Sequence, residues 1–510
     1  MSRANTAPEA PAGLRRIDHW VGGGPFSGRP EGCLRLHNPA TGESTADVAL
    51  GSSADVDHAV EIAMAAYREW GRTALGRRTA ILFRFCELVR SRADDLARTI
   101  VREHGKVLAD ARGEVQRGLE VAEFACGIPQ LLKGEFSENV STDVDSWSIR
   151  QPLGVVAGIT PFNFPVMVPM WMYPIAIAAG NAFVLKPSEK DPSASILAAE
   201  LWREAGLPDG VFNVVHGAKT AVDRILEHPG IAAVSFVGST PVARHVYETG
   251  ARHGKRVQAL GGAKNHMVVL PDADMELAAD SAVNAAFGSA GQRCMAISVL
   301  VAVGDAADRV IPLIEQRMRA IRVGHGMHPD SDMGPLVTAE HRERVAGYVE
   351  AGLASGAALA VDGRGVEVPG GERGYFLGPC LFDRVEPGMS IYREEIFGPV
   401  LSVVRVEGYR DAIALVDSSP YANGVALFTR DGGVARRFQS EVQVGMVGIN
   451  VPIPVPMAYY SFGGWRGSMF GDSHAHGAEG VRFYTRAKVV TARWPSPAMQ
   501  GKNLGFPTVS

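Results

Sequence analysis

The stretch AVSFVGSTPVARHVYETGARH, residues 233–253, carries the pattern that decides the fold. Its first five residues are mostly apolar, as in a buried strand, and residues 241–253 are typical of a helix. Gly238 and Ser239 lie at the turn between them, where backbone N–H groups at a helix N-terminus can bind an anion. The later glycines of the GxGxxG dinucleotide motif are absent, so a plain strand-to-helix turn remains an alternative to a nucleotide site.

Similar apolar runs lie on both sides of this stretch and alternate with helix-like segments such as 194–205. The runs before residue 294 are 154–159, 182–185, 211–215 and 267–270, and those after it are 298–303, 401–406, 425–428 and 446–450. Residues 56–106 precede both series and have apolar side chains at helical spacing. The alternation predicts one parallel α/β sheet before residue 294 and a second α/β domain after it.

Two further segments, 147–151 and 481–492, are β-prone and flanked by polar residues. This composition is typical of exposed strands that pair outside the main sheets. We therefore expect them to form an oligomerisation element.

The chain has 510 residues, beyond the size of one hydrophobic core, and a net charge of −4. No block of Lys and Arg indicates a nucleic-acid partner. The most apolar stretch, 164–180, is interrupted by prolines and is shorter than the about 20 residues of a membrane helix, so no membrane span is expected. The first dozen residues lack the apolar core of a signal peptide, and the five cysteines show no paired spacing. These features favour a cytoplasmic protein without a disulfide or zinc framework.

Three further motifs supply reactive groups. KPSE (186–189) follows a strand-like run and would place a cation and a carboxylate at the carboxyl edge of the sheet. Cys294 lies in a loop of small residues beside Arg293, whose charge would favour the thiolate, although a lone cysteine can equally be inert and buried. Asn163, held between prolines in TPFNFP, is suited to donate to an oxyanion, or it belongs to a rigid turn.

Together these motifs resemble the aldehyde dehydrogenase superfamily from about residue 67 to residue 494. The landmarks occur in the family's order: TPFNFP (160–165), KPSE (186–189), FVGST (236–240), LGG (260–262), GQRC (291–294) and EEIFGP (394–399). The resemblance implies an α/β fold of the aldehyde dehydrogenase type, with a Rossmann-type NAD-binding domain, an α/β catalytic domain and a small β oligomerisation element of a homotetramer or homodimer. The expected boundaries are 1–140 and 158–258 for the NAD-binding domain, 259–445 for the catalytic domain, and 141–157 with 480–495 for the oligomerisation strands.

The resemblance also implies a role for each matching residue. Cys294 would be the nucleophile, and the Asn163 amide and the Cys294 backbone N–H would form the oxyanion hole. Lys186 and Glu189 would bind the adenosine ribose of NAD, and Glu395 would bind the nicotinamide ribose. Because a carboxylate repels a 2′-phosphate, Glu189 favours NAD over NADP. The other residues expected around the cofactor are Thr160, Phe162, Lys190, Gly238, Ser239, Gly261 and Phe397.

One position departs from the family pattern. Most hydrolytic members have Glu-Leu-Gly-Gly where this chain has Ala259 before LGG. That glutamate activates water against the acyl-enzyme, and loss of a positioned base costs about 10²–10⁴-fold in rate. A free thiol can attack a thioester without a strong protein base. The departure therefore predicts coenzyme A (CoA) as the acyl acceptor.

GAKNH (262–266), GQRCMA (291–296) and INVPIPVP (449–456) are similar to the methylmalonate-semialdehyde dehydrogenase branch, which acylates CoA. In that branch two arginines bind the substrate carboxylate, and the matching residues are Arg117 and Arg293. A solvated helix face is the alternative for Arg117. The implied reaction oxidises a semialdehyde acid through a Cys294 thioester, with decarboxylation and transfer to CoA, as in valine catabolism. The product is propionyl-CoA or acetyl-CoA, because one methyl group discriminates by only about 1–3 kcal/mol.

Two other functions stay open. A hydrolytic aldehyde dehydrogenase needs another base, for which Glu395 is the only carboxylate within the motifs expected at the pocket. The second alternative is a catalytically silent structural protein with the same fold. Such a protein would not need the catalytic and cofactor-binding residues that match the family. The loop with His474 and His476 has no companion ligands, so we expect a surface loop and no metal site.

Overall fold

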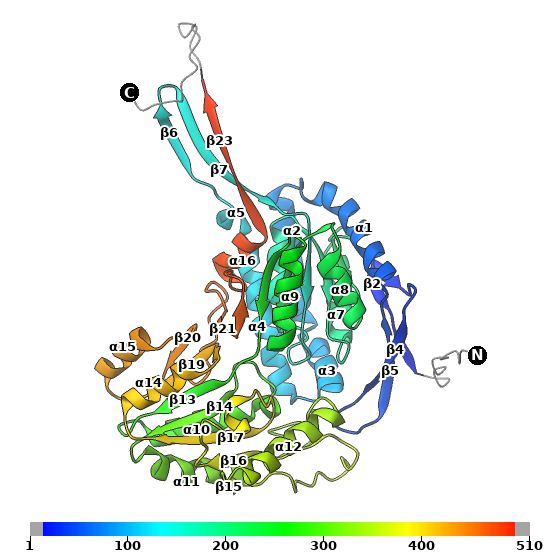
Figure 1. The fold of residues 1–510 in the computed structure, drawn as a ribbon. Helices are drawn as coiled ribbons and strands as arrows, with labels where there is room; N and C mark the ends of the chain where they lie inside the picture. The colour runs from blue at the N-terminus through cyan, green and yellow to red at the C-terminus, as the bar shows by residue number, and fades with distance from the viewer. Residues whose placement is uncertain (1–13, 495–510) are drawn as a thin grey trace, which may run out of the picture.

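The computed structural model describes residues 14–494, which form two large α/β bodies and a projecting arm (Figure 1). Residues 1–13 of the predicted NAD-binding domain and residue 495 of the predicted oligomerisation strands lie outside the described residues. A small sheet at the start of the chain consists of β1 (Arg15–Ile17), β5 (Ser44–Leu50) and β4 (Gly32–His37). Within residues 14–494, no helix has both the length and the apolar character that crossing a membrane requires.

The first large sheet has eight strands, and its five central strands are parallel. Their spatial order is β22 (Met469–Phe470), β12 (Arg256–Leu260), β11 (Ile231–Val237), β8 (Val155–Ile159), β9 (Ala182–Lys186), β10 (Phe212–Val214), β2 (His19–Val21) and β3 (Gly24–Phe26). Strand β8 is entirely buried and apolar, with Val155 and Ala157 facing one layer of the core and Val156 the other. Such continuous apolar strands form because helices cover both faces of a parallel sheet.

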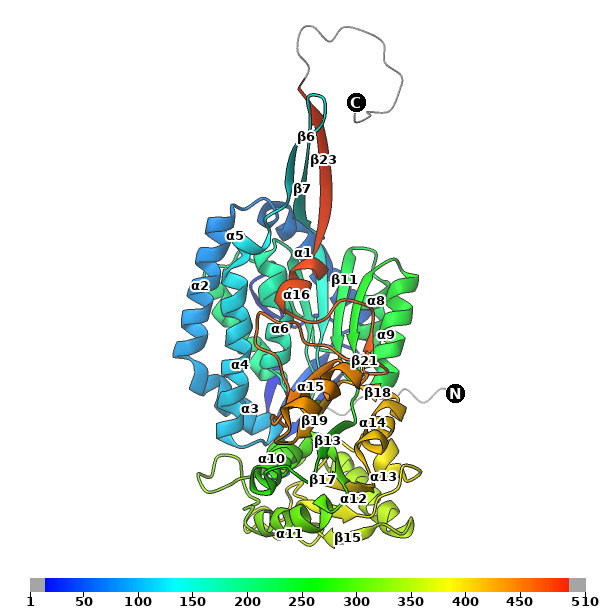
Figure 2. The same ribbon diagram turned by 90° about the vertical axis from the view of Figure 1, so that its left-hand side faces the viewer.

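Two layers of helices enclose this sheet (Figures 1 and 2). One layer contains α1 (Ser53–Trp70), α8 (Lys219–Glu227) and α9 (Thr240–Arg252). The other contains α2 (Leu75–Ser91), α3 (Ala93–His104), α4 (Leu108–Cys126), α6 (Met167–Ala178) and α7 (Ser193–Glu204). Helix α6 is buried along its whole length and packs against α4, so the segment that joins β8 to α6 is fixed at both ends.

The second large sheet has seven strands, all parallel except the edge strand β15. Their order is β15 (Ala358–Val361), β16 (Cys380–Asp383), β17 (Val400–Val406), β14 (Ile297–Val303), β13 (Asn265–Val269), β19 (Gly424–Phe428) and β20 (Met446–Ile449). The helices packed with it are α10 (Met275–Phe287), α11 (Ala306–Arg319), α12 (Ala339–Ala354), α14 (Tyr409–Ser418) and α15 (Gly432–Glu441).

The assignment of run 267–270 to the first sheet was wrong. This run is strand β13, which pairs with β14 and β19 in the second sheet. The last parallel strand of the first sheet is β12, which the sequence did not reveal because it begins with Arg256 and contains Gln258. The connection that leads from the first sheet into the second therefore has four residues, 261–264.

The arm consists of β6 (Phe136–Ser141), β7 (Val144–Pro152) and β23 (Thr485–Arg493), with β7 in the middle (Figure 1). Two predictions need correction here. Residues 481–484 are not extended, because α16 (Gly477–Phe483) precedes the strand. Residues 136–140 belong to the arm, whereas 155–157 belong to β8 of the first sheet, since the buried apolar side chains of 155–157 pack between the helix layers. The role of the arm in oligomerisation stays a prediction.

Asn181 connects the arm to the first sheet. Its side-chain oxygen accepts hydrogen bonds from the backbone N–H groups of Leu153 at 2.7 Å and Gly154 at 3.1 Å. Its side-chain nitrogen donates to the carbonyls of Ala176 and Tyr484, each at 3.0 Å. The residue is fully buried, so no water replaces a lost partner.

We expect Asn181→Ala to lower the apparent thermal unfolding midpoint by about 5 °C or more. The substitution removes the side-chain partner of four backbone groups. The Ala176 carbonyl keeps its bond from the Asn181 N–H, and each group left unpaired costs about 1–3 kcal/mol before relaxation. Differential scanning calorimetry at a fixed scan rate checks the result. A midpoint within about 1 °C of the wild-type value would show that Asn181 does not hold the arm in place.

Candidate active site

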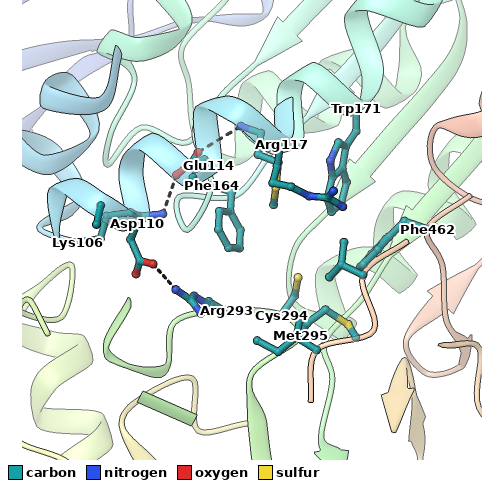
Figure 3. A pocket seen from close by; sticks show the side chains of 15 residues that line it. Lys106, Asp110, Glu114, Arg117, Phe164, Trp171, Arg293, Cys294, Met295 and Phe462 are labelled. Atoms are coloured by element: carbon teal, nitrogen blue, oxygen red, sulfur yellow. Dashed lines mark hydrogen bonds and ion pairs between the residues drawn. The ribbon is translucent and has the colours of Figure 1, made fainter. Parts of the chain in front are cut away.

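Cys294 lines a cavity of about 300 Å³ between the two bodies (Figure 3). Most of the cavity wall is apolar, and charged side chains reach it from α4, from Lys106 just before α4, and from the Cys294 loop. The apolar lining comprises Phe164, Met167, Trp171, Met295, Ile453, Val455 and Phe462, and the charged lining comprises Lys106, Asp110, Glu114, Arg117 and Arg293. An apolar cavity with a few convergent polar groups is typical of a small-molecule site.

The loop before Cys294 has an unusual backbone. Ser289 and Ala290 have φ values of 54° and 52°, in the left-handed region that non-glycine residues rarely occupy. The neighbouring Gln292 is fully buried, and its side-chain oxygen accepts from the backbone N–H of Val337 at 3.1 Å. Strain of this kind costs about 1–3 kcal/mol per residue and persists only where the surroundings enforce it. The loop thus holds the Cys294 thiol at the cavity wall.

The thiol of Cys294 is a poor nucleophile in this structure. Burial and the negative charge of Glu395 raise the pKa of Cys294 to about 12, and the positive charge of Arg293 offsets only part of that rise. Arg293 favours the thiolate, as expected, but burial and the Glu395 charge outweigh its effect on the Cys294 pKa. The Arg293 guanidinium also forms an ion pair with Asp110.

Arg117 and Arg293 both line the cavity, and both have carboxylate partners on α4. Arg117 pairs with Glu120 at 2.6 Å and donates to the carbonyl of Pro456 at 2.7 Å. Only about a third of the Arg117 side chain is exposed, so Arg117 does not lie on a fully solvated helix face. A ligand carboxylate that enters the cavity would meet two guanidinium groups already oriented by these contacts.

On its other side, Cys294 shares a smaller cavity with Ala263, Glu395 and Phe397. A Glu395 oxygen accepts from the backbone N–H of Ala263 at 3.0 Å, and burial raises the pKa of this carboxyl group. The ring of Phe397 packs edge-on against that of Phe162, with centroids 5.8 Å apart. The structure thus brings Glu395 and Phe397 to Cys294 from a loop more than 100 residues later in the chain.

The carboxyl edge of the first sheet carries the residues predicted to bind a nucleotide. Lys186 and Glu189 form an ion pair at 2.9 Å, and although burial opposes it, the Lys186 ammonium lowers the pKa of Glu189. The ammonium of Lys190 lies 4.8 Å from the centroid of the Phe162 ring. The Thr160 hydroxyl is buried and has no hydrogen-bond partner within residues 14–494. These groups provide hydrogen-bond donors and acceptors at the carboxyl edge of the first sheet, as nucleotide binding requires.

Gly238, Ser239 and Gly261 lie together at the start of α9. Ser239 precedes the helix in an extended conformation, and its side chain makes no capping hydrogen bond. A Cβ atom at Gly261 would come within 2.7 Å of the carbonyl oxygen of Gly467 and 2.9 Å of the Thr240 hydroxyl. Only glycine fits at residue 261, because the backbone of Gly467, just before β22, packs directly against this turn.

Asn163 is buried at 3% exposure, and its side-chain amide has no hydrogen-bond partner in the part of the chain that the structure describes. Its backbone carbonyl accepts from the Lys106 ammonium at 2.6 Å. Lys106 and Glu114 were not among the predicted site residues, although both line the cavity. The only sequence signal for them was Lys106 in the EHGK stretch that precedes α4.

The prediction of a surface loop at His474 and His476 was wrong for His476. This residue is 2% exposed, and its ring packs edge-on against Trp171 at 5.5 Å. His474 instead pairs with Glu479 at 2.9 Å. The glycine-rich sequence suggested exposure, but the aromatic wall of the cavity covers His476. Within residues 14–494, no three His, Cys, Asp or Glu side chains are grouped so as to hold a metal ion.

Comparisons with known proteins agree with this geometry. A model of the aldehyde dehydrogenase family matches residues 27–490. The chain is 54% identical over 476 residues to malonate-semialdehyde dehydrogenase from Pseudomonas aeruginosa, covering 93% of this chain and 96% of that protein.

Two solved structures are also similar to the chain. A protein from Sinorhizobium meliloti, provisionally named methylmalonate-semialdehyde dehydrogenase and solved with NAD, has a TM-score of 0.95 and 52% identity, covering 96% of this chain and all of that one. Methylmalonate-semialdehyde dehydrogenase from Oceanimonas doudoroffii has a TM-score of 0.93 and 53% identity, covering 95% of this chain and 99% of that one.

We expect Glu395→Gln to increase the rate at which iodoacetamide alkylates Cys294 at about pH 8 by several-fold. Removal of the negative charge lowers the thiol pKa, and one pKa unit changes the thiolate fraction about tenfold. Mass spectrometry of the peptide that contains Cys294 separates its reaction from that of the exposed Cys33. The matched control is Glu394→Gln, because Glu394 bonds Tyr348 and does not contribute to the Cys294 shift. Equal rates in the wild type and Glu395→Gln would contradict the electrostatic account of the thiol.

Proposed function

The chain belongs to the aldehyde dehydrogenase family, and on that basis we propose that it oxidises malonate or methylmalonate semialdehyde with NAD and transfers the acyl group to CoA. The observation that carries the proposal is the cavity that the Cys294 thiol shares with the guanidinium groups of Arg117 and Arg293. A semialdehyde acid has its aldehyde and carboxylate only a few atoms apart. One such molecule can therefore contact the thiol with its aldehyde and a guanidinium group with its carboxylate at the same time.

The names of the similar proteins support this substrate class. The relative from Pseudomonas aeruginosa is named for malonate semialdehyde, and the two solved structures are named for methylmalonate semialdehyde. The two substrates differ by one methyl group, which an apolar wall distinguishes by about 1–3 kcal/mol. We propose that the cavity accepts both.

The residues at the sheet edge fit NAD. The buried Thr160 hydroxyl lacks a partner within residues 14–494, and the Lys186 and Glu189 side chains present a donor and an acceptor suited to ribose hydroxyls. The Glu189 carboxylate would repel a 2′-phosphate, which favours NAD over NADP. When bound, NAD supplies the hydride acceptor for the oxidation.

The protein's own groups account for the covalent chemistry. The Cys294 thiol loses its proton to solvent, the thiolate attacks the aldehyde carbon, a C–S bond forms, and negative charge moves to the carbonyl oxygen. The Asn163 amide and the Cys294 backbone N–H stabilise that charge in our proposal. Loss of a hydride from the same carbon leaves a thioester on Cys294. Arg117 and Arg293 hold the carboxylate and thereby orient the aldehyde toward the sulfur.

The groups around Cys294 support a thiol as the acyl acceptor. Ala259 is fully buried in β12 and provides only a methyl group. The carboxylates that line the two cavities beside Cys294 are Asp110, Glu114 and Glu395, and each already has a partner in Arg293, Lys106 or the Ala263 N–H. Asp110 and Glu114 are held in ion pairs, which leaves Glu395 as the candidate base for water, whereas a thiol needs less help to attack a thioester.

Decarboxylation and transfer complete the proposed reaction. Loss of CO2 leaves the electron pair of the broken C–C bond on the carbon beside the thioester carbonyl, where a proton then adds. The CoA thiolate next attacks the thioester carbon, the new C–S bond forms, and the Cys294 thiolate leaves. Methylmalonate semialdehyde gives propionyl-CoA, and malonate semialdehyde gives acetyl-CoA.

We also propose that the arm joins subunits of a cytoplasmic homodimer or homotetramer. In the part of the chain that the structure describes, β6 and β23 are the two outer strands of this sheet, and Phe136 and Val489 are about two-thirds exposed on them. Exposed apolar strand edges are typical of surfaces that pair with another chain.

Arg117→Ala should raise the KM for a semialdehyde acid at least tenfold and leave the KM for propanal nearly unchanged. A hydrogen bond to a charged group contributes about 1.5–3 kcal/mol, and propanal has no carboxylate to bind. Initial rates of NADH formation with both aldehydes measure the effect. Arg112→Ala is the matched control on the same helix, since Arg112 pairs with the exposed Asp94 away from the cavity. An equal rise for both aldehydes in Arg117→Ala would refute the carboxylate-binding role.

A further inference from the structure

A buried ammonium group lies behind the proposed oxyanion donor. The Lys106 side chain is 1% exposed, and its Nζ donates to the Glu114 carboxylate at 2.7 Å and to the Asn163 carbonyl at 2.6 Å. The same Nζ lies 4.4 Å from the centroid of the Phe164 ring, which faces the cavity (Figure 3). Lys106 therefore contacts two consecutive residues of the segment that joins β8 to α6.

The Glu114 carboxylate binds the same segment, between β8 and α6, closer to its C-terminal end. Glu114 is buried, and its second oxygen accepts from the backbone N–H groups of Val166 at 2.8 Å and Met167 at 3.2 Å. These are free donors at the start of α6, which a carboxylate satisfies well. One ion pair thus fixes both ends of the segment 163–167, which contains Asn163.

Stability alone does not explain this ion pair, because a buried ion pair rarely gains more from attraction than it loses on desolvation. Its effect on geometry is direct. Asn163 has no side-chain partner within residues 14–494 that would orient its amide, so the position of its backbone decides where the amide can point. A displacement of about 1 Å at a reacting centre can cost about 100-fold in rate.

We propose that Lys106, held by Glu114, is a positioning residue that fixes the Asn163 amide for stabilising the oxyanion during aldehyde oxidation. The inference rests on the proposed function, because it takes Asn163 as the oxyanion donor. Lys106 acts through the Asn163 backbone carbonyl and does not itself touch the reacting atoms. Its removal should therefore slow the chemical step and leave substrate binding nearly unchanged.

The test is a double-mutant cycle on the single-turnover rate of NADH formation, with Lys106→Met, Asn163→Ala and the double variant. Asn163→Ala should lower the rate about 100-fold or more, as for other oxyanion donors. Lys106→Met should lower it about 10- to 100-fold, with the half-saturating semialdehyde concentration within about threefold of the wild-type value. In the Asn163→Ala background, Lys106→Met should change the rate less than about threefold, because its target is already gone.

Two controls keep the outcome decisive. Lys219→Met removes an exposed lysine that pairs with Asp223 on α8, and it should leave the rate unchanged. If the unpaired Glu114 charge prevents Lys106→Met from folding, the cycle uses Lys106→Met with Glu114→Gln, whose amide oxygen still accepts from the N–H groups of Val166 and Met167. NAD binding, followed by protein fluorescence, confirms the fold of each variant.

The outcomes separate the inference from the function on which it rests. Rate losses that multiply, with Lys106→Met still costing tenfold or more in the Asn163→Ala background, would overturn the positioning role and leave the oxyanion assignment intact. A wild-type rate in Asn163→Ala would overturn the oxyanion assignment itself and the positioning role with it. Loss of the Lys106 effect in the Asn163→Ala background supports both.

Discussion

The four-residue connection 261–264 is the constraint on which the site depends. It leaves the carboxyl end of β12 in the first sheet and enters the amino end of β13 in the second, so these two sheet edges must face each other. The segments after β8, β9 and β11 therefore meet the segments before β13, β14 and β17. Hydrogen bonds across the junction confirm the contact, since Gly262 donates to the Thr240 hydroxyl and Ala263 to Glu395. Lys264 fixes the opposing loop through the carbonyls of Ile391 and Glu394.

A second consequence of this junction is that charges around Cys294 are balanced in pairs. Asp110 neutralises Arg293, Glu120 partners Arg117, and Glu114 partners Lys106. Balanced charges lower the cost of burial, and they also mean that an entering carboxylate must compete for its guanidinium partners. Burial and the negative charge of Glu395 raise the pKa of the Cys294 thiol, and Arg293 offsets only part of that rise.

Much of this site could be predicted from the sequence, because the residues in short motifs at strand ends are determined by the local backbone geometry. The small-residue loop before Cys294, the KPSE stretch after β9 and the missing carboxylate at Ala259 are all visible without coordinates. Contacts between distant segments are not visible in this way. Neither the pairing of Asp110 with Arg293 nor the contact of Lys106 with Asn163 follows from spacing, since both depend on how α4 packs against the loops.

The errors in the fold have the same origin. The sequence predicted β13 in the first sheet because adjacent apolar segments usually share a sheet. Its pairing with β14 and β19 shows that the chain has already passed to the second sheet, through residues 261–264. Residues 481–484 look β-prone by composition, yet they pack as the end of α16 and the residue after it, with Phe483 and Tyr484 buried in the core of the first body. Tertiary burial overrides β-propensity at such positions.

The most direct test of the central claim is the fate of the acyl group when CoA is withheld. The protein is mixed with excess NAD and methylmalonate semialdehyde, NADH is followed by stopped-flow absorbance, and the intact mass is recorded before and after CoA is added. The account predicts a burst of at most one NADH per subunit and an acyl adduct on the peptide with Cys294 that CoA removes as a thioester. Continuous NADH formation without CoA, with free acid as the product, would contradict it.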